Sequence, residues 1–483
     1  MSAFIRRVAA GAGWLYAYRW LERLLDFLSV VVLARLLSPD DFGLVAIAAS
    51  VAAIVEGLSA FDVNKALIRS REDDRGLFDS AWTLSVLRGL LAALCMVAVA
   101  PFLDDHRLSQ VLLVLAVSPL LNGLANPRFV LFERELVYSR LAVLTLGSRL
   151  VAVTLTLGLA VVYRSYWALV LGMVAGSLVS LILSYALRPY RPRPSFARFD
   201  AIFAFSGWLS LTSVVTTLAM ETDRILVGKL VGIADAGLYF MTQRVGVLPT
   251  RELISPLQRL LFPSFSELAE DRGRLRRGVQ ESINVLGSLS LPAACGFALV
   301  ANDFVPLVLG DQWQSIVPLL TVLVPYLGLR ATLSMALPCV MALGETRLLF
   351  WVSFVYALVH LPVFIAGTIL FALPGAIGGI VLAGVLYIYL NAWMLRRTLE
   401  ISIPEILRQL RRPLLATALM VAAILGADAL LVIELFTREG SWLALAVKIP
   451  LGGVVFCSAL AALWRLEGRP AGIERRMLEL LAR

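Results

Sequence analysis

Apolar runs of about the length that crosses a bilayer recur from one end of the chain to the other. Of the 483 residues, 59% are apolar and only 16% are charged, and the mean hydropathy is +0.84. A soluble domain needs more polar surface than this, because its exterior must face water. The chain is therefore predicted to be an all-α integral membrane protein, which excludes a soluble enzyme and a nucleic-acid-binding domain.

About fourteen of these runs qualify as transmembrane helices of roughly twenty residues. Trp167, Trp313 and Trp442 stand at or near the ends of runs, where indole rings prefer the lipid headgroup region. In chain order, the predicted spans are 14–37, 42–61, 81–103, 108–125, 141–163, 166–187, 201–220, 236–255, 283–301, 316–337, 348–371, 376–395, 414–433 and 442–464.

The basic side chains orient the spans. An even number of spans puts both termini on one side, and 30 of the 43 Lys and Arg residues lie on that side. Because the cytoplasmic side of a membrane protein carries the excess of Lys and Arg, both termini are predicted to be cytoplasmic. This asymmetry accounts for the net charge of +9 without a nucleic-acid partner. The longest loop, about 256–281, is basic and is predicted to be cytoplasmic.

A shift of 194 positions aligns the first pair of spans with the seventh and eighth. Asp41 then meets Asp235 and Gly43 meets Gly237, in a turn where Asp suits a helix N-cap and Gly suits close approach. The repeat predicts two pseudo-symmetric six-helix lobes followed by a C-terminal helix pair: residues 1–190, 191–400 and 401–483. Such repeats are one way to build an alternating-access transporter with its site between the lobes.

The C-terminal tail, 472–483, places Ile473, Met477, Leu480 and Leu481 on one helical face. An amphipathic segment of this kind is predicted to lie on the inner membrane surface. A frayed tail remains the alternative.

Four charges interrupt the first span with helical spacing. Arg19, Glu22, Arg23 and Asp26 stand at i, i+3, i+4 and i+7, so all four share one face of a helix. Facing lipid, they would cost roughly 10–14 kcal/mol. They are therefore predicted to face water or protein, and the alternative is that Arg19–Glu22 and Arg23–Asp26 simply neutralise one another.

The seventh span carries a milder polar stripe in equivalent positions. Under the same shift Arg19 falls on Ser213 and Arg23 on Thr217. We therefore expect the first and seventh spans to line one central hydrated cavity.

Further arginines lie inside other spans: Arg88, Arg149, Arg244 and Arg330. Because the guanidinium fork matches phosphate oxygens, a cavity with more arginine than carboxylate predicts an anionic, phosphate-bearing substrate. For any one arginine a structural role stays open.

Two acidic residues are weaker candidates for binding a coupling proton or cation. Glu56 is expected to be buried in the second span. Asp223 ends the seventh span, where an exposed helix cap is the alternative. Four cysteines and two histidines lie far apart in the sequence, so neither a disulfide, a metal site nor a cofactor is predicted.

Several segments resemble a known family. They are ARLLSPDDFG at 34–43, FSGW at 205–208, DRILVGKLVG at 223–232, AGLY at 236–239 and PSFS at 263–266. In this order and spacing the chain resembles the Wzx-type polysaccharide flippases of the multidrug/oligosaccharidyl-lipid/polysaccharide (MOP) superfamily, over roughly residues 10–400.

The resemblance implies a V-shaped, two-lobed transporter of the bacterial inner membrane, with no enzymatic activity. Its substrate would be undecaprenyl-diphosphate-linked oligosaccharide for O-antigen, capsule or exopolysaccharide synthesis. Its other partners would be membrane lipids, a polysaccharide polymerase and a chain-length regulator. Related lipid II flippases place cavity charges at first-span positions that Arg19, Arg23 and Asp26 match here. The coupling ion stays unidentified.

Two alternatives are open. A membrane glycosyltransferase or O-antigen polymerase needs a sizeable outer loop, and the outer loops near 40–41 and 104–105 are predicted to be only a few residues long. A multidrug exporter of the same superfamily favours organic cations, for which an arginine-rich cavity is unsuitable.

Overall fold

The computed structural model describes residues 3–58, 67, 75–135, 137–198, 207–430 and 442–468. Regular structure in these ranges is helical throughout, without a β-strand. Nine helical segments within them are long and apolar enough to cross a membrane. The chain is therefore an all-α membrane protein, as predicted.

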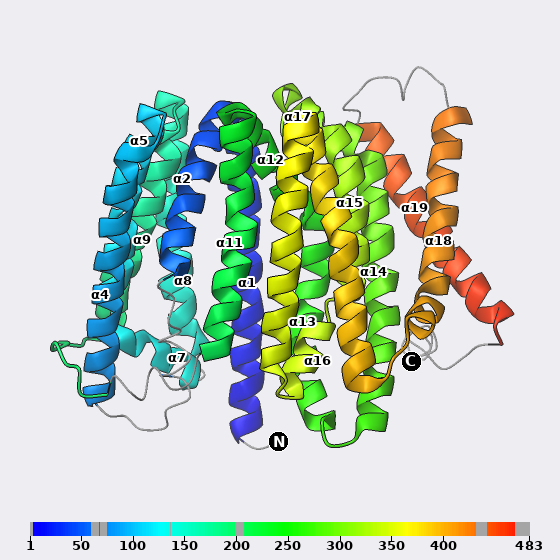
Figure 1. Cartoon of the computed structure of the whole chain (residues 1–483), viewed down its shortest axis with the longest axis horizontal. Helices are drawn as coiled ribbons and strands as arrows, with labels where there is room; N and C mark the ends of the chain where they lie inside the picture. Colours follow the sequence, from blue (N-terminus) through cyan, green and yellow to red (C-terminus); the bar gives the residue numbers. More distant parts are fainter. Residues whose placement is uncertain are drawn as a thin grey trace. The chain divides into compact units, whose positions relative to one another are not determined.

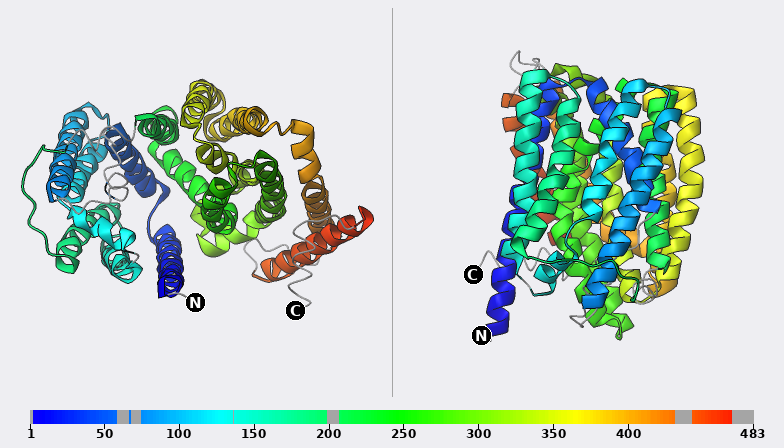
Figure 2. Two further views of the ribbon diagram at one scale, coloured as in Figure 1. Left: turned by 90° about the horizontal axis from the view of Figure 1, so that it is seen from below. Right: turned by 90° about the vertical axis from the view of Figure 1, so that its left-hand side faces the viewer.

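Chain contacts divide the protein into two compact units, Met1–Gly237 and Leu238–Arg483. Figures 1 and 2 show the helices of each unit running side by side. The first unit contains α1 Ala3–Leu36, α2 Pro39–Leu58, α4 Arg75–Val99, η1 Ala100–Phe102, α5 His106–Leu115, α6 Val117–Gly123, η2 Pro127–Val130, α7 Leu131–Arg134, α8 Tyr138–Tyr163, α9 Trp167–Leu187 and α11 Gly207–Leu230. Helix α12, Ile233–Gly246, continues into the second unit, with α13 Leu248–Leu268, α14 Arg272–Val308, η3 Asp311–Ile316, α15 Val317–Thr332, α16 Ala336–Ala342, α17 Thr346–Leu399, α18 Ile403–Leu430 and α19 Trp442–Leu466.

The turn before α2 is fixed by a reciprocal pair of hydrogen bonds. The Ser38 amide donates to Asp41 Oδ2 at 2.9 Å, and the Asp41 amide donates to Ser38 Oγ at 3.2 Å. This is the capping-box pattern, with Pro39 at the first helical position where a missing N–H costs nothing. Ser38 therefore caps the helix, and Asp41, predicted as the cap, stands three residues later.

The predicted loop 256–281 is wrong, because almost all of it is helical. Helix α13 continues to Leu268 through Pro256 and Pro263, and α14 begins at Arg272. Ile254 and Phe265 are buried in the same apolar cluster as Leu275 of α14, with Leu257, Leu261 and Leu268 packed against it. Their three- and four-residue spacing gives the segment a helical apolar face that prolines alone do not break.

Two other spans differ in detail. The seventh continues ten residues beyond its predicted end at 220, because α11 runs to Leu230. The eleventh and twelfth are the arms of a helical hairpin, α17, separated only by non-helical Phe371 and Ala372. The predicted surface helix of the tail, 472–483, lies outside the described residues.

A charged triad joins the C-terminal helix pair to α14. Lys448 of α19 contacts Asp428 of α18 at 3.0 Å. Asp303 of α14, only 4% exposed, accepts from the same Lys448 Nζ at 2.9 Å. The triad therefore ties three helices of the second unit together.

Candidate functional site: a polar cavity and a helix seam in the first unit

The four charges of α1 share a face, as their spacing predicts. Arg19, Glu22, Arg23 and Asp26 are all half-buried. Exposed large apolar side chains lie on a different side of this helix, among them Trp20, Leu24 and Leu28. The helix thus presents one charged face and one apolar face.

Asp26 pairs with a residue from another helix. Its carboxylate forms an ion pair with Arg149 of α8, and both side chains are partly exposed, 35% and 40%. Helices α1 and α8 pack along one another, which brings the two residues together. Near Asp26, the Arg19 guanidinium lies 5.8 Å from the Tyr18 ring, and its Nε is buried with no hydrogen-bond partner among the described residues.

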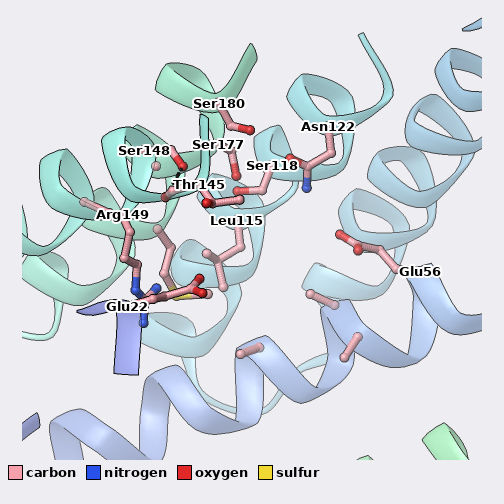
Figure 3. A pocket seen from close by; sticks show the side chains of 16 residues that line it. Glu22, Glu56, Leu115, Ser118, Asn122, Thr145, Ser148, Arg149, Ser177 and Ser180 are labelled. Atoms are coloured by element: carbon pink, nitrogen blue, oxygen red, sulfur yellow. Dashed lines mark hydrogen bonds between the residues drawn. The ribbon is translucent and has the colours of Figure 1, made fainter. Parts of the chain in front are cut away.

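A cavity of about 500 Å³ lies inside the first unit beside this ion pair (Figure 3). Helices α1, α2, α5, α6, α8 and α9 supply its walls. The charged lining is Glu22, Glu56 and Arg149, and Figure 3 shows the two carboxylates at opposite ends of a group of uncharged polar side chains. Those polar side chains are Ser118, Asn122, Thr145, Ser148, Ser177 and Ser180.

In the cavity, the hydroxyl groups of α8 act as hydrogen-bond acceptors, because their own hydrogens are already donated. Thr145 Oγ1 donates to the Leu141 carbonyl and Ser148 Oγ to the Leu144 carbonyl, each at 2.9 Å. A hydroxyl that donates to its own helix keeps lone pairs for a partner in the cavity. Such a wall suits a ligand rich in O–H donors.

The sequence missed this row of hydroxyls. The available signal was the i, i+3 spacing of Thr145 with Ser148 and of Ser177 with Ser180, inside otherwise apolar spans.

Of the residues predicted for a substrate cavity, Glu22 and Arg149 line this one, and so does Glu56, predicted for ion coupling. Two carboxylates and one guanidinium do not give an arginine excess here. Ser213 of α11 is exposed, and Arg244 lies 5.8 Å from the Phe240 ring. Arg330 lies 4.3 Å from the Tyr387 ring centroid. Both of these arginines therefore contact aromatic rings, and neither lines this cavity.

Glu56 and Asp223 differ from expectation. Glu56 is exposed, because the last turn of α2 faces the cavity, and Arg88 of α4 is close enough to interact with its charge. Asp223 is only 5% exposed, because α11 continues for two further turns beyond it, so the alternative of an exposed helix cap is wrong.

Helix α11 packs against α2 along a contact that we call the seam, which also includes the first turn of α12. At its centre Ser50, fully buried, donates to Glu221 Oε2 at 2.7 Å. Arg224 donates to the same oxygen at 2.6 Å. Towards the end of α2, Thr217 packs against Gly57.

At the other end of the seam two glycines contact backbone reciprocally. A Cβ on Gly43 would lie 1.8 Å from the Ile233 carbonyl oxygen, and a Cβ on Gly237 would lie 1.9 Å from the Pro39 carbonyl oxygen. The shift of 194 positions aligns Gly43 with Gly237 and Pro39 with Ile233. The two copies of the repeat therefore contact each other here through equivalent residues, related by a local two-fold axis. Glycine is required at both positions, because any side chain would collide with backbone.

Comparison with known proteins fixes the family. The sequence profile described as "Polysaccharide biosynthesis protein" matches residues 32–318, more than half of the chain. The chain belongs to this polysaccharide biosynthesis protein family. The predicted resemblance is thereby confirmed.

Curated relatives agree with this family. Lipopolysaccharide biosynthesis protein WzxC of Escherichia coli (strain K12) is 28% identical over 62% of this chain and 62% of WzxC, which is less than two thirds of either. Succinoglycan biosynthesis transport protein ExoT of Rhizobium meliloti (strain 1021) is 24% identical over 73% of this chain and 72% of ExoT.

Solved structures show the fold of this family member. The lipid II flippase MurJ in its inward closed conformation superposes with a TM-score of 0.76 at 14% identity, over 93% of this chain and 98% of MurJ. An inward-facing multidrug resistance MATE transporter of the MOP superfamily gives 0.61 at 15% identity, over 78% and 94%. The chain therefore shares the fold of these two transporters.

Proposed function

We propose that this protein is a flippase that moves undecaprenyl-diphosphate-linked oligosaccharide repeat units across the membrane by alternating access. The observation that carries the proposal is the hydroxyl-lined cavity inside helices that can cross a membrane. Sugar O–H groups are donors that such a wall of acceptors suits, and the chain belongs to a polysaccharide biosynthesis family. The names WzxC and ExoT, and the MurJ fold, support the same function.

Arg19 is the best candidate for contact with the diphosphate. Its buried Nε has no acceptor among the residues that the structure describes, and a phosphate oxygen would supply one with full charge. We extend the proposed substrate contacts to Glu22, Arg23, Asp26 and Arg149 on the evidence of the shared α1 face and the Asp26–Arg149 pair. Arg88, Ser213, Thr217, Arg244 and Arg330 stay predictions, as do Glu56 and Asp223 for ion coupling.

The surroundings of the site follow from the basic residues and the repeat. We place the protein in the bacterial inner membrane with both termini cytoplasmic, and retain the lobes 1–190 and 191–400 with the hairpin 401–483. A polysaccharide polymerase and a chain-length regulator are its proposed partners in surface polysaccharide synthesis.

The polymerase alternative has little room for an active site. Within the described ranges, the connections expected on the outer side are short: 37–38, 103–105, 164–166 and 231–232. A sugar-binding catalytic loop needs more chain than these provide.

Liposomes that contain the purified protein and lipid-linked oligosaccharide test the proposal. The protein should expose oligosaccharide from the inner leaflet to an external probe and should form no glycosidic bond. Arg19→Ala should abolish this movement, whereas Arg274→Ala, which removes an exposed arginine of the second unit that is not part of the cavity lining, should leave it unchanged. A polymerised product, or equal rates for both variants, contradicts the proposal.

The seam is also a proposed gate, which must part during transport. The ideal Cβ of Gly57 lies 3.4 Å from Thr217 Cβ, close to the separation of about 3.5–4.5 Å in a disulfide. Oxidation of Gly57→Cys/Thr217→Cys, in a background without the four native cysteines, should stop transport, and reduction should restore it. The single substitutions Gly57→Cys and Thr217→Cys, which cannot form the link, are the matched controls and should transport under the same oxidising conditions. Transport through an oxidised Gly57–Thr217 link excludes the gate.

A further inference from the structure

The two arms of α17 form a groove at their open end, in the second unit. The arms touch near the turn, where a Cβ on Gly367 would lie 2.4 Å from the Gly375 carbonyl oxygen and the reverse contact is 2.0 Å. Further along, Tyr356 and Tyr387 meet edge to face with ring centroids 5.1 Å apart. Beyond this ring pair a cavity of about 550 Å³ opens between the arms. Figure 1 shows the two arms side by side, with the turn at the end labelled α17.

The groove is lined by two matching ladders of residues. On the first arm Arg347, Trp351 and Val355 follow at four-residue steps, and on the second arm Tyr389, Trp393 and Arg397 do the same. Because the arms are antiparallel, arginine stands level with arginine, tryptophan with tryptophan, and Val355 with Tyr389. From mouth to floor the lining is therefore cationic, then indole, then apolar, over about 12 Å at 1.5 Å per residue.

This order matches the depth profile of a lipid. The phosphate lies outermost, the ester region prefers indole rings, and the chains need apolar surface. Trp351 and Tyr389 are 47% and 53% exposed, so the groove is open to its surroundings. The Trp351 ring is held edge-on by Phe350 and Phe354, at centroid distances of 5.4 and 6.0 Å, and is thus oriented before any ligand arrives.

The charges of the mouth favour an anion. Among the described residues of the lining, Glu345 is the one acidic residue, so two guanidinium groups outweigh one carboxylate. Arg397 also lies 5.5 Å from the Trp393 ring centroid. Two like charges at one level repel each other, and a shared phosphate removes that repulsion while it accepts hydrogen bonds from both forks. Basic pockets between transmembrane helices on the cytoplasmic side bind anionic lipid headgroups in general.

We infer that this groove binds one anionic phospholipid of the phosphatidylglycerol class, with its phosphate between Arg347 and Arg397 and its chains along the tryptophans. In the proposed topology the mouth lies at the cytoplasmic leaflet. The site is separate from the flippase cavity, which lies in the first unit, and its test uses no oligosaccharide. A failure of the flippase proposal therefore leaves it standing, and the reverse also holds.

Native mass spectrometry of the detergent-solubilised full chain tests the site. Phosphatidylglycerol and phosphatidylethanolamine of identical chains are titrated separately, and the bound fraction gives each dissociation constant. Phosphatidylglycerol should bind at least about fivefold more tightly, because one net charge near a phosphate is worth about that factor. Equal binding of the zwitterionic lipid overturns the inference.

Matched variants locate the binding. Arg347→Ala/Arg397→Ala should weaken phosphatidylglycerol binding about thirtyfold, at about fivefold for each arginine. Arg396→Ala removes the neighbouring exposed arginine, which is not part of the lining, and should change the affinity less than twofold. If the double alanine variant does not fold, Arg347→Gln and Trp351→Ala are measured singly, and each should weaken binding. Wild-type affinity in the groove variants excludes the site.

Competition separates the possible occupants. Inorganic phosphate at millimolar concentration should not displace phosphatidylglycerol, because it lacks chains for the indole and apolar levels. Displacement by phosphate identifies a site for the free ion. Tighter binding of polyprenyl diphosphate identifies a substrate-entry site. Either result refutes the assignment to a phospholipid.

Discussion

An alanine at Gly43 acts as a wedge in the seam. The added Cβ meets the Ile233 carbonyl oxygen at 1.8 Å, whereas ordinary carbon–oxygen contacts begin near about 3.3 Å. The helices must therefore separate by about 1.5 Å, since both partners are backbone and cannot rotate away. Overpacking of this kind costs about 1–3 kcal/mol, which corresponds to a change of about five- to 150-fold in the population of the closed seam.

Gly158→Ala is the matched control. Gly158 lies within α8, and a Cβ there has no neighbour within 4 Å. The control should be neutral or gain up to about 1 kcal/mol, because alanine is a better helix former than glycine. The two substitutions are chemically identical, so their difference isolates the collision in the seam.

Thiol accessibility gives the measurement. A cysteine at Ala236, a fully buried position beside the contact, should react with a membrane-impermeant reagent five- to 150-fold faster in Gly43→Ala than in Gly158→Ala, on the estimate above. Gly237→Ala added to Gly43→Ala should increase the rate much less than either does alone, because the same interface is already parted. Equal rates in the Gly43 and Gly158 variants, or full additivity, refute the reciprocal contact.

Three other perturbations have defined outcomes. Lys448→Met leaves Asp303 buried without its cation and should cost about 3–5 kcal/mol, seen as a lower melting temperature that Asp303→Leu in the same chain largely restores. Asp26→Asn removes a half-exposed ion pair worth at most about 1 kcal/mol, so it should slow flipping in liposomes while the melting temperature hardly moves. Asp105 caps α5, and the side-chain hydrogen bond from Arg107 is the main cause that lowers its pKa. The charged carboxylate therefore stabilises the fold at any pH above the ordinary carboxyl pKa of about 4, and this stabilisation is lost as the pH falls through the lowered pKa. The melting temperature of wild type should accordingly exceed that of Asp105→Asn at neutral pH and converge with it in acid.

The helices were predictable because the bilayer sets their length. Apolar runs predicted 141–163 and 442–464, and the structure has Tyr138–Tyr163 and Trp442–Leu466. The errors occur where helices continue beyond the apolar runs, to Leu230 of α11 and to Leu268 of α13. There the apolar run ends before the helix does, because a narrow apolar face in α13, or packing against a neighbouring helix in α11, supports the remaining turns.

The site was predictable only in part, because its pairings are tertiary. Spacing placed Asp26 on the charged face of α1, but it offered Arg23 as the partner, whereas the ion pair in the structure is with Arg149 of α8. Burial was also misjudged: Glu56 faces a cavity and Asp223 does not face solvent. A single sequence predicts which residues share a face of a helix, but it does not predict which other helix packs against that face.

The repeat shows how far sequence and structure combine. In the sequence, the internal repeat makes Gly43 and Gly237 equivalent. The structure adds that Gly43 contacts the backbone of Ile233, next to Gly237 in α12, and that Gly237 contacts the backbone of Pro39, next to Gly43 in α2. Because the two contacts are related by the repeat, motion that separates Gly43 from Ile233 also separates Gly237 from Pro39. Ser50 and Glu221 lie on the same seam, so their 2.7 Å hydrogen bond must break in that motion as well. A seam held in this way parts as a unit rather than by unzipping from one end, which is the behaviour that a gate between two access states requires.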